Sequence, residues 1–347
     1  MPTVADRRRP RASDRPDSPY LLDSFGRRAV DMRVSLIDKC NLRCQYCMPA
    51  DGLAWLPKNE LLSTSELNRL VRIAVQRLGV TTIRFTGGEP LLNPDAVAIV
   101  QAAATLPERP RVAMTTNGIG LVRQARALAA AGLSRVNVSL DSLDPATFHA
   151  ITRRDRLADV LAGLAAAGEA GLSPIKVNAV LLRGVNAHEA CGLLEYCLER
   201  GYELRFIEQM PLDPQHGWRR EQMVTAEEIL ALLAGRFHLT PASQARGSAP
   251  AERWLVDGGP GSVGVIASVT QPFCAACDRT RLTADGQIRT CLFATGETDL
   301  RGPLRAGADD EELAEIWRSA MWQKAAGHGV NTPGFSQPAR PMSAIGG

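Results

Sequence analysis

The stretch DMRVSLIDKCNLRCQYC, residues 31–47, joins an apolar strand pattern to three closely spaced cysteines. Residues 31–38 are rich in Val, Leu and Ile, which suits a strand buried in a parallel sheet. Cys40, Cys44 and Cys47 follow that strand directly in a C-x3-C-x2-C pattern. At this cysteine content, roughly 0.004 such matches are expected by chance, so the spacing indicates a metal site.

Strand and helix patterns alternate beyond this stretch. Further short Val/Ile/Leu-rich strands are predicted at 80–86, 111–115, 135–140, 175–182 and 203–209. A capping box at Ser63 to Glu66 begins a helix that ends near Gly79. Helical spacing recurs over 121–131, 156–170 and 187–200. Six strand–helix units in series predict an α/β fold, either a doubly wound sheet or a (β/α) barrel, complete or partial.

Polar residues at the ends of several strands favour the barrel, because barrel enzymes place their chemistry at the carboxyl ends of many strands. These segments are 38–40, 86–89, 116–118 and 139–141. After about residue 215 the pattern changes to a smaller α+β region, with a hairpin turn at Asp285-Gly286. The predicted organisation is a disordered tail over 1–22, a barrel over 23–214 and a second domain over 215–347.

Composition excludes several classes of protein. Forty Lys and Arg against 37 Asp and Glu leave a net charge of +3, too weak to indicate nucleic-acid binding. The chain has no run of 18 apolar residues and no apolar secretory signal, so we expect no membrane span. Eight cysteines in 347 residues do not resemble a small disulfide scaffold. We therefore expect a cytoplasmic protein with reduced thiols.

The first cysteine trio (Cys40, Cys44 and Cys47) suits an iron–sulfur cluster better than zinc. A structural zinc site needs four ligands, and no His or fourth Cys lies nearby in the sequence. Three thiolates can hold three corners of a four-iron cube and leave its fourth iron open to a small molecule. Tyr46 offers an aromatic face for stacking, and the Gly87-Gly88 pair lets backbone approach a ligand.

The second cysteine trio (Cys274, Cys277 and Cys291) again supplies three thiolates. Its longer spacing is less specific, and a Cys3His zinc site completed by His238 or His328 is an alternative. Given the first trio, a second iron–sulfur cluster is the favoured interpretation. The two remaining cysteines, Cys191 and Cys197, are six positions apart in a helix and are expected to be buried apolar residues.

Basic residues recur in the predicted strands, where the alternation of side chains would direct them inward. Several cations inside one barrel require an anion, and a triphosphate is the obvious kind. The chain has no GKS/T phosphate loop, so side chains would have to hold the phosphates. The basic residues are Arg33, Arg84, Lys176, Arg205, Arg279 and Arg281.

The first trio, Tyr46 and the segment Gly87-Gly88-Glu89-Pro90 together resemble the radical S-adenosylmethionine (SAM) superfamily. The resemblance implies a partial (β/α)6 barrel and a [4Fe-4S] cluster whose open iron binds SAM. It further implies that an electron from the cluster cleaves SAM, giving a 5′-deoxyadenosyl radical that abstracts a substrate hydrogen. The SAM contacts that it implies are Tyr46, Gly88, Ser139 and Met210.

From about Asp23 to Gly347 the sequence is similar to the GTP 3′,8-cyclase family, through segments such as 83–90, 205–208 and 273–282. The similarity implies conversion of GTP to (8S)-3′,8-cyclo-7,8-dihydroguanosine 5′-triphosphate, the first step of molybdenum cofactor biosynthesis. It implies a second [4Fe-4S] cluster that binds guanine. The implied GTP contacts are Arg33, Arg84, Thr115, Lys176, Arg205, Arg279 and Arg281. The implied catalytic residues are Cys40, Cys44, Cys47, Arg33, Arg279, Gly346 and Gly347.

The implied partners are a reducing electron donor such as flavodoxin or ferredoxin, the next enzyme of the pathway (cyclic pyranopterin monophosphate synthase) and a second copy of the chain as a homodimer. One alternative is another radical-SAM enzyme with an auxiliary cluster, such as a peptide-modifying one. In such an enzyme the Arg279/Arg281 pair and the terminal Gly-Gly would have no evident use. A non-catalytic zinc or iron–sulfur binding protein is the other alternative, and metal analysis separates it.

Overall fold

The structure is a computed structural model that describes residues 10–346. The chain divides into two compact units. The first comprises Met1–Lys39, Ala54–Ala113 and Cys274–Gly347, and the second comprises Cys40–Leu53 and Met114–Phe273. The strand β3 (Arg111–Thr116) begins in the first unit and ends in the second.

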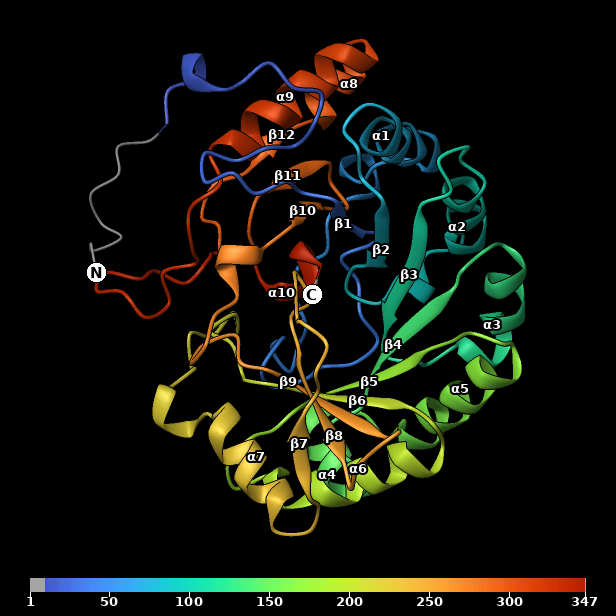
Figure 1. Ribbon diagram of the computed structural model, residues 1–347. Helices are drawn as coiled ribbons and strands as arrows, with labels where there is room; N and C mark the ends of the chain where they lie inside the picture. The colour runs from blue at the N-terminus through green and yellow to red at the C-terminus, as the bar shows by residue number, and fades with distance from the viewer. Residues whose placement is uncertain (1–9, 347) are drawn as a thin grey trace. The chain divides into compact units, whose positions relative to one another are not determined.

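Three parallel strands form the centre of the first unit. β10 (Arg279–Leu282), β1 (Asp31–Ser35) and β2 (Thr82–Thr86) lie side by side in that order (Figure 1). Beyond β10, the antiparallel strands β11 (Gln287–Arg289) and β12 (Thr298–Asp299) continue the ladder. The helices of this unit are α1 (Thr64–Gln76), α2 (Ala96–Ala104), α8 (Arg301–Arg305), α9 (Asp310–Trp322) and α10 (Met342–Ile345).

Strand register in this unit fixes the position of three arginines. Arg33 in β1 pairs with Arg281 in β10 on one side and with Arg84 in β2 on the other. Side chains at paired positions of neighbouring strands point to the same face of a sheet. The three arginines therefore form one row across the sheet, called here the arginine row.

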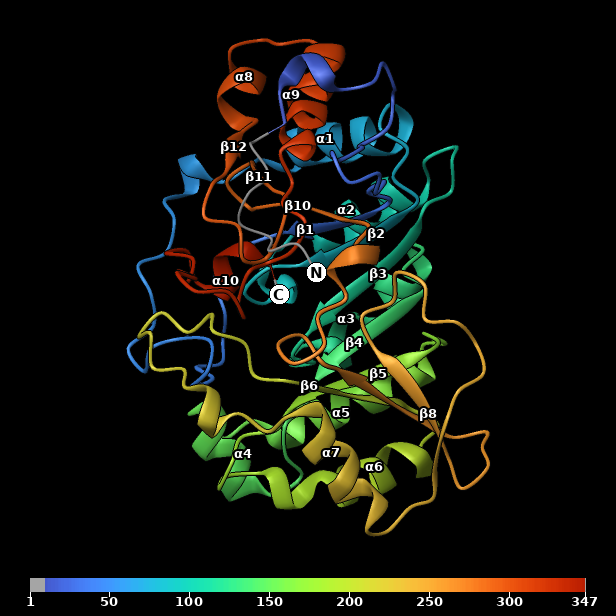
Figure 2. The ribbon, with the colours of Figure 1, turned by 60° about the vertical axis from the view of Figure 1, so that its left-hand side comes forward.

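In the second unit, four parallel strands carry the helices. β4 (Arg135–Ser139), β5 (Ile175–Val180), β6 (Glu203–Ile207) and β9 (Ser262–Ile266) pair in that order. β8 (Glu252–Val256) and β7 (Leu239–Pro241) add an antiparallel edge. The helices are α3 (Leu121–Ala130), α4 (Pro145–Thr152), α5 (Leu157–Glu169), α6 (Ala190–Glu199) and α7 (Ala226–Ala234). Helices α4 to α7 lie together on one side of these strands (Figure 2).

The compact units do not follow the predicted boundary between residues 214 and 215, and strand pairing explains the difference. β9 pairs in register with β6, so residues up to 273 belong with the second unit. β10 pairs with β1, so residues 274–347 belong with the first unit, far from them in sequence.

The segment 10–22 packs on α9, so the expected disorder of residues 1–22 does not hold for this part. The indole N–H of Trp322 donates to the carbonyl of Arg11 at 2.9 Å, and Arg15 forms an ion pair with Glu315. Leu21 is fully buried. Trp322 and Glu315 of α9, together with the burial of Leu21, therefore hold this segment in place. Residues 1–9 lie outside the described residues.

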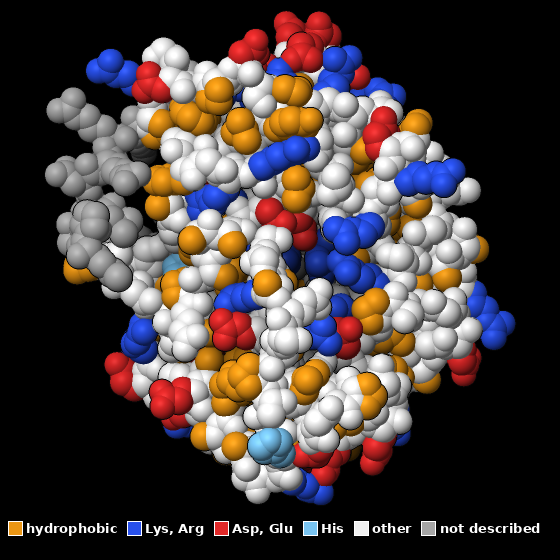
Figure 3. Space-filling view, in the orientation of Figure 1, with side chains coloured by type: hydrophobic (Ala, Val, Ile, Leu, Met, Phe, Trp, Pro, Cys, Tyr) orange, Lys and Arg blue, Asp and Glu red, His pale blue; other side chains and the backbone are white. Residues whose placement is uncertain are grey.

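Acidic and basic side chains are interspersed over the face shown in Figure 3, in agreement with the small net charge of +3. Among the described residues, no helix is long and apolar enough to cross a membrane.

Candidate active site

The first cysteine trio lies in a loop of the second unit, directly after the chain leaves β1. The backbone N–H of Arg43 donates to the carbonyl of Thr152, at the end of α4, over 2.9 Å. A tight turn brings the N–H of Cys47 to the carbonyl of Cys44, also at 2.9 Å. None of the three cysteines, Cys40, Cys44 and Cys47, forms a disulfide bond. Backbone hydrogen bonds thus hold the loop that carries the three thiols.

Electrostatics show that these thiols lie close to one another. The pKa of Cys44 is raised well above its usual value, first by burial and then by the charges of Asp141, Cys47 and Cys40. Three thiolates in such a place need nearby positive charge, which iron supplies. Asn117 lies beside them, with its amide nitrogen 4.0 Å from the sulfur of Cys40. The donor set therefore fits a [4Fe-4S] cluster held at three corners.

A buried carboxylate fixes the ring of Tyr46, between two of the cysteines. The Tyr46 hydroxyl donates to Asp141 at 2.7 Å, and the other oxygen of Asp141 accepts the backbone N–H of Val180 at 2.8 Å. Burial raises the pKa of Asp141 to about 6. Ser139 lies two residues before this carboxylate, at the end of β4, and is half-buried. The sequence predicted polar residues at this strand end, but no local pattern indicates that Asp141 is the partner of Tyr46.

The Gly87-Gly88 pair lets two backbone segments of the first unit pass closely. A Cβ atom on Gly88 would lie 2.2 Å from the carbonyl oxygen of Lys39, and one on Gly87 would lie 2.4 Å from that of Ile37. The N–H of Gly88 donates to Ile37 at 2.8 Å, and that of Glu89 donates to Lys39 at 2.7 Å. These glycines therefore position the residue directly before Cys40.

The arginine row and Arg279 concentrate positive charge in the first unit. Arg84, Arg279 and Arg281 are buried, and a carboxylate oxygen of Asp31 lies 3.9 Å from the guanidinium of Arg84. The pKa of Arg281 is lowered to about 9, first by burial and then by the charge of Arg33. Burial likewise lowers the pKa of Arg33, whose buried Nε has no hydrogen-bond partner among the described residues. This arrangement suits a multiply charged anion.

In the second cysteine trio, Cys277 faces two cations. The ammonium group of Lys324 lies 3.4 Å from its sulfur, and a guanidinium nitrogen of Arg279 lies 3.8 Å from it. Burial alone raises the pKa of a thiol, but these charges bring the pKa of Cys277 below its usual value. Burial raises the pKa of Cys274, which also feels the charge of Cys291. Sequence reasoning missed Lys324, because no pattern links it to Cys277.

The Cys3His zinc alternative finds no support in the geometry. The ring of His328 packs on Phe293, with centroids 5.0 Å apart, and its Nδ1 accepts the N–H of Val330 at 3.1 Å. Among the described residues, no three His, Cys, Asp or Glu side chains are arranged to hold a single metal ion. The second trio is thus three mutually interacting thiols beside cations, which fits a negatively charged iron–sulfur cluster.

The C-terminal segment reaches the arginine row. The carbonyl of Gly346 accepts a hydrogen bond from the guanidinium of Arg281. Gly346 has a φ of +85°, and a Cβ atom there would lie 2.4 Å from Ser35 Oγ and 2.8 Å from Thr86 Cγ2. Only glycine fits both the space and the backbone conformation. Gly347 lies outside the described residues.

The remaining predicted nucleotide contacts belong to the second unit. Lys176 forms an ion pair with Glu203 at 2.5 Å, and Arg205 lies 4.0 Å from the same carboxylate. Burial lowers the pKa of Lys176, and the charge of Arg205 adds to this effect. Thr115 Oγ1 lies 3.5 Å from the amide nitrogen of Asn137. Glu203 therefore joins the two cations.

Comparisons with known proteins agree with this description. Residues 34–197 match the Radical SAM superfamily, and residues 202–330 match Molybdenum Cofactor Synthesis C. The fold resembles that of Streptococcus suis SuiB, with a TM-score of 0.59 at 15% identity over 90% of this chain and 75% of that one. The SAM-bound form of SuiB gives a TM-score of 0.55 at 15% identity, over 87% of this chain and 73% of that one. The fold and the first cysteine trio thus define a radical SAM protein, which confirms the predicted fold class.

Relatives that match almost the whole chain identify the family within the radical SAM superfamily. A GTP 3′,8-cyclase of Streptomyces coelicolor is 64% identical over 97% of this chain and 99% of its own length. Another, from Mycobacterium sp. (strain KMS), is 63% identical over 100% of this chain and 98% of its own length. The chain belongs to the GTP 3′,8-cyclase family. Its place in the radical SAM superfamily implies a [4Fe-4S] cluster and SAM.

Proposed function

We propose that this protein uses SAM to convert GTP to (8S)-3′,8-cyclo-7,8-dihydroguanosine 5′-triphosphate, the first step of molybdenum cofactor biosynthesis. The family names of its full-length relatives and both family matches support the proposal. The single structural observation that carries it is the arginine row, because three adjacent, largely buried guanidinium groups suit the charge of a triphosphate.

The two cysteine trios would hold two [4Fe-4S] clusters. When bound, the first would supply the electron that cleaves SAM, and the resulting radical would take the 3′ hydrogen of GTP so that C3′ can bond to C8. One further electron and a proton would then complete the dihydro product. Cys40, Cys44 and Cys47 hold this cluster. Cys274, Cys277 and Cys291 would hold the second, which is proposed to bind the guanine. The ammonium group of Lys324, 3.4 Å from the sulfur of Cys277, would offset the negative charge of a cluster held there.

The nucleotide is held by the arginine row together with Arg279. Guanidinium groups bind phosphate oxygens through paired N–H donors, and burial strengthens such bonds. Holding the triphosphate rigidly places the ribose and base in one reactive orientation, which favours an intramolecular bond. Lys176, Arg205 and Thr115 are proposed as further contacts with GTP. Arg33 and Arg279 also belong to the proposed catalytic set with Gly346 and Gly347.

For SAM, the proposed contacts are Tyr46, Gly88, Ser139 and Met210. The hydrogen bond from Tyr46 to Asp141 holds the aromatic ring in one orientation, so its face is ready to stack on a base. Gly88 contributes backbone that a side chain would block. Ser139 and Met210 follow strands β4 and β6, respectively.

The proposal extends to partners of the reaction. An electron donor such as flavodoxin or ferredoxin would reduce the first cluster, and cyclic pyranopterin monophosphate synthase would consume the product. A homodimer and a cytoplasmic location complete the proposal.

The function is tested by supplying anaerobic protein with SAM, GTP and a strong reductant. We expect 5′-deoxyadenosine and a cyclised nucleotide to form together, and both to require GTP. SAM cleavage that is independent of GTP, or that requires a peptide, would overturn the assignment. Metal analysis should give about eight irons per chain with matching sulfide. Zinc without sulfide would instead indicate a binding protein.

Two cysteine variants distinguish a specific role of the second trio from a general loss of folding. Cys274→Ala should halve the iron content and abolish cyclisation while the first cluster remains. Cys191→Ala is the matched control, because this half-buried cysteine of α6 belongs to neither trio, and its sulfur lies 3.5 Å from the carbonyl oxygen of Leu232. Full cyclisation activity in the Cys274→Ala variant would contradict the role of the second cluster.

A further inference from the structure

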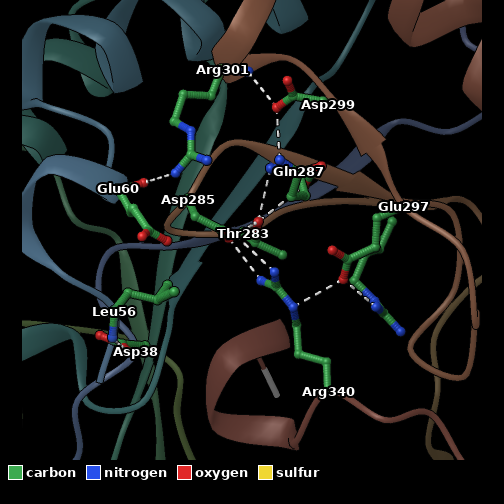
Figure 4. Close-up of polar contacts among 11 residues, drawn as sticks. Asp38, Leu56, Glu60, Thr283, Asp285, Gln287, Glu297, Asp299, Arg301 and Arg340 are labelled. Atoms are coloured by element: carbon green, nitrogen blue, oxygen red, sulfur yellow. Dashed lines mark hydrogen bonds and ion pairs between the residues drawn. The ribbon is translucent and has the colours of Figure 1, made fainter. Parts of the chain in front are cut away.

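An ion-pair network joins the end of the chain to the β10–β11 hairpin (Figure 4). The guanidinium of Arg340 donates two parallel hydrogen bonds to the carboxylate of Asp285, at 2.7 and 2.8 Å. Its Nε lies 3.0 Å from Glu297. A guanidinium that meets a carboxylate through two parallel bonds has a fixed orientation as well as a favourable energy. Arg340, Asp285 and Glu297 are called here the tail clamp.

The acceptor of the clamp is prearranged. Asp285 is buried in the turn between β10 and β11, where it also accepts the hydroxyl of Thr283 at 2.6 Å. The turn closes through a bond from the N–H of Gly286 to the carbonyl of Thr283 at 3.0 Å. Burial alone raises the pKa of Asp285, but the bonds from Arg340 and Thr283 bring it below its usual value. The turn and the Thr283 hydroxyl therefore orient this carboxylate independently of the C-terminal segment, and Arg340 favours its charged form.

The same hairpin holds the segment at its far end. Arg281 lies four positions before Asp285, and it donates to the carbonyl of Gly346. Gly346 follows Arg340 by only six positions, and between them Ile345 is almost fully buried. A segment this short, fixed at both ends and buried in the middle, has little freedom to adopt another path.

Glu297 extends the clamp towards the second cysteine trio. Besides Arg340, it pairs with Arg289, a buried residue of β11. Arg289 lies two positions before Cys291 and also donates to the carbonyl of Ala294. Glu297, in the loop that follows Cys291, thus pairs both with Arg289 of β11 and with Arg340 of the C-terminal segment.

We propose that Arg340 is a positioning residue, whose ion pairs with Asp285 and Glu297 hold the C-terminal segment on the β10–β11 hairpin so that the Gly346 carbonyl fixes Arg281. This rests on the proposed function, in which Arg281 contacts GTP. A guanidinium oriented by a carbonyl on one side presents its remaining N–H groups to an anion in a defined direction.

Hydrogen exchange of the full chain without GTP tests the clamp directly. In Arg340→Gln, the amides of residues 342–346 should exchange about tenfold faster, because hydrogen bonds to a charged partner are lost. Arg340→Lys should be intermediate, since lysine keeps the charge but not the paired bonds. Arg183→Gln is the matched control, because it removes an ion pair with Glu228 of similar length, 2.7 Å, in the second unit. Unchanged exchange of residues 342–346 in Arg340→Gln would overturn the proposal.

A double-mutant cycle separates the clamp from general loosening of the structure. Asp285→Asn alone should accelerate exchange of residues 342–346 about as much as Arg340→Gln, and the double variant should add little. Effects that multiply would show that the two residues act independently, which contradicts the clamp. Exchange over α5 should stay constant throughout and reports that the variants are folded.

Turnover then tests whether the clamp serves the reaction. Arg340→Gln should lower the rate of GTP cyclisation about tenfold while both clusters remain at full iron content. A rate equal to that of the unaltered protein, despite faster exchange, would overturn the positioning role. Failure of the unaltered protein to cyclise GTP would sink the proposed function instead, and the exchange results would still decide whether the clamp exists.

Discussion

Replacing Gly88 by alanine should dislodge the first cysteine trio without touching any cysteine. The new Cβ would lie 2.2 Å from the carbonyl oxygen of Lys39 and 2.4 Å from that of Asp38. Both are backbone atoms, so no side-chain rotation relieves the overlap. Ordinary contact begins near 3.4 Å, and the two segments must separate by about 1 Å. Lys39 directly precedes Cys40, so the displacement passes to the first ligand.

The loss of folding free energy in Gly88→Ala can be estimated from the new overlap and from the hydrogen bonds that are broken. Overpacking of this kind costs about 1–3 kcal/mol. Separation also breaks the backbone bonds from Gly88 to Ile37 and from Glu89 to Lys39, at about 1 kcal/mol each. A total of about 3–5 kcal/mol should lower the melting temperature of a 347-residue chain by about 4–7 °C. The iron bound by the first trio should fall by more than half.

Anaerobic reconstitution followed by iron and sulfide analysis, with a thermal melt of the same sample, measures both effects. Gly192→Ala is the matched control, because that helical glycine has no atom within 4 Å of the added Cβ. It should leave the iron content unchanged and stabilise α6 by up to about 1 kcal/mol. Normal iron content and melting temperature in Gly88→Ala would refute the account of the loop.

Three further predictions concern charge. Arg305 lowers the pKa of Glu66 to about 2, so the stability that this carboxylate adds is present above about pH 4.5 and lost as the pH falls towards 2. The melting temperatures of Glu66→Gln and the unaltered protein should therefore differ at pH 7 and converge in acid, and a constant difference would contradict the pairing. Arg33→Gln removes the centre of the arginine row and should raise the KM for GTP at least tenfold, and an unchanged KM would count against the row as the phosphate site. Lys324→Gln should lower the iron held by the second trio, and full iron content would show that the ammonium group is dispensable.

Local sequence patterns predicted the parts of the fold that depend on neighbours in the chain. The capping box at Ser63 begins helix α1, as predicted, and a box of the same kind at Thr225 begins α7. The Asp285-Gly286 turn joins β10 to β11. Helix α2 was not predicted, because Gln101 is its only polar residue and its N-cap residue makes no capping bond.

Contacts between distant segments could not be predicted from local patterns. β10 lies beside β1 although about 240 residues separate them in the sequence, and this pairing decides which residues form each unit. The arginine row arises from the same pairing, so the sequence predicted its members but not their order. Lys324 and Arg340 reach Cys277 and Asp285 only through tertiary packing, and neither carries a local motif.

The central claim is that a hydrogen at C3′ of GTP is removed while SAM is cleaved. Anaerobic turnover with GTP deuterated only at C3′, followed by mass spectrometry of the 5′-deoxyadenosine, tests this most directly. The 5′-deoxyadenosine should carry the deuterium, and the cyclised nucleotide should have lost it. Unlabelled 5′-deoxyadenosine, formed while the nucleotide keeps its deuterium, would contradict the account.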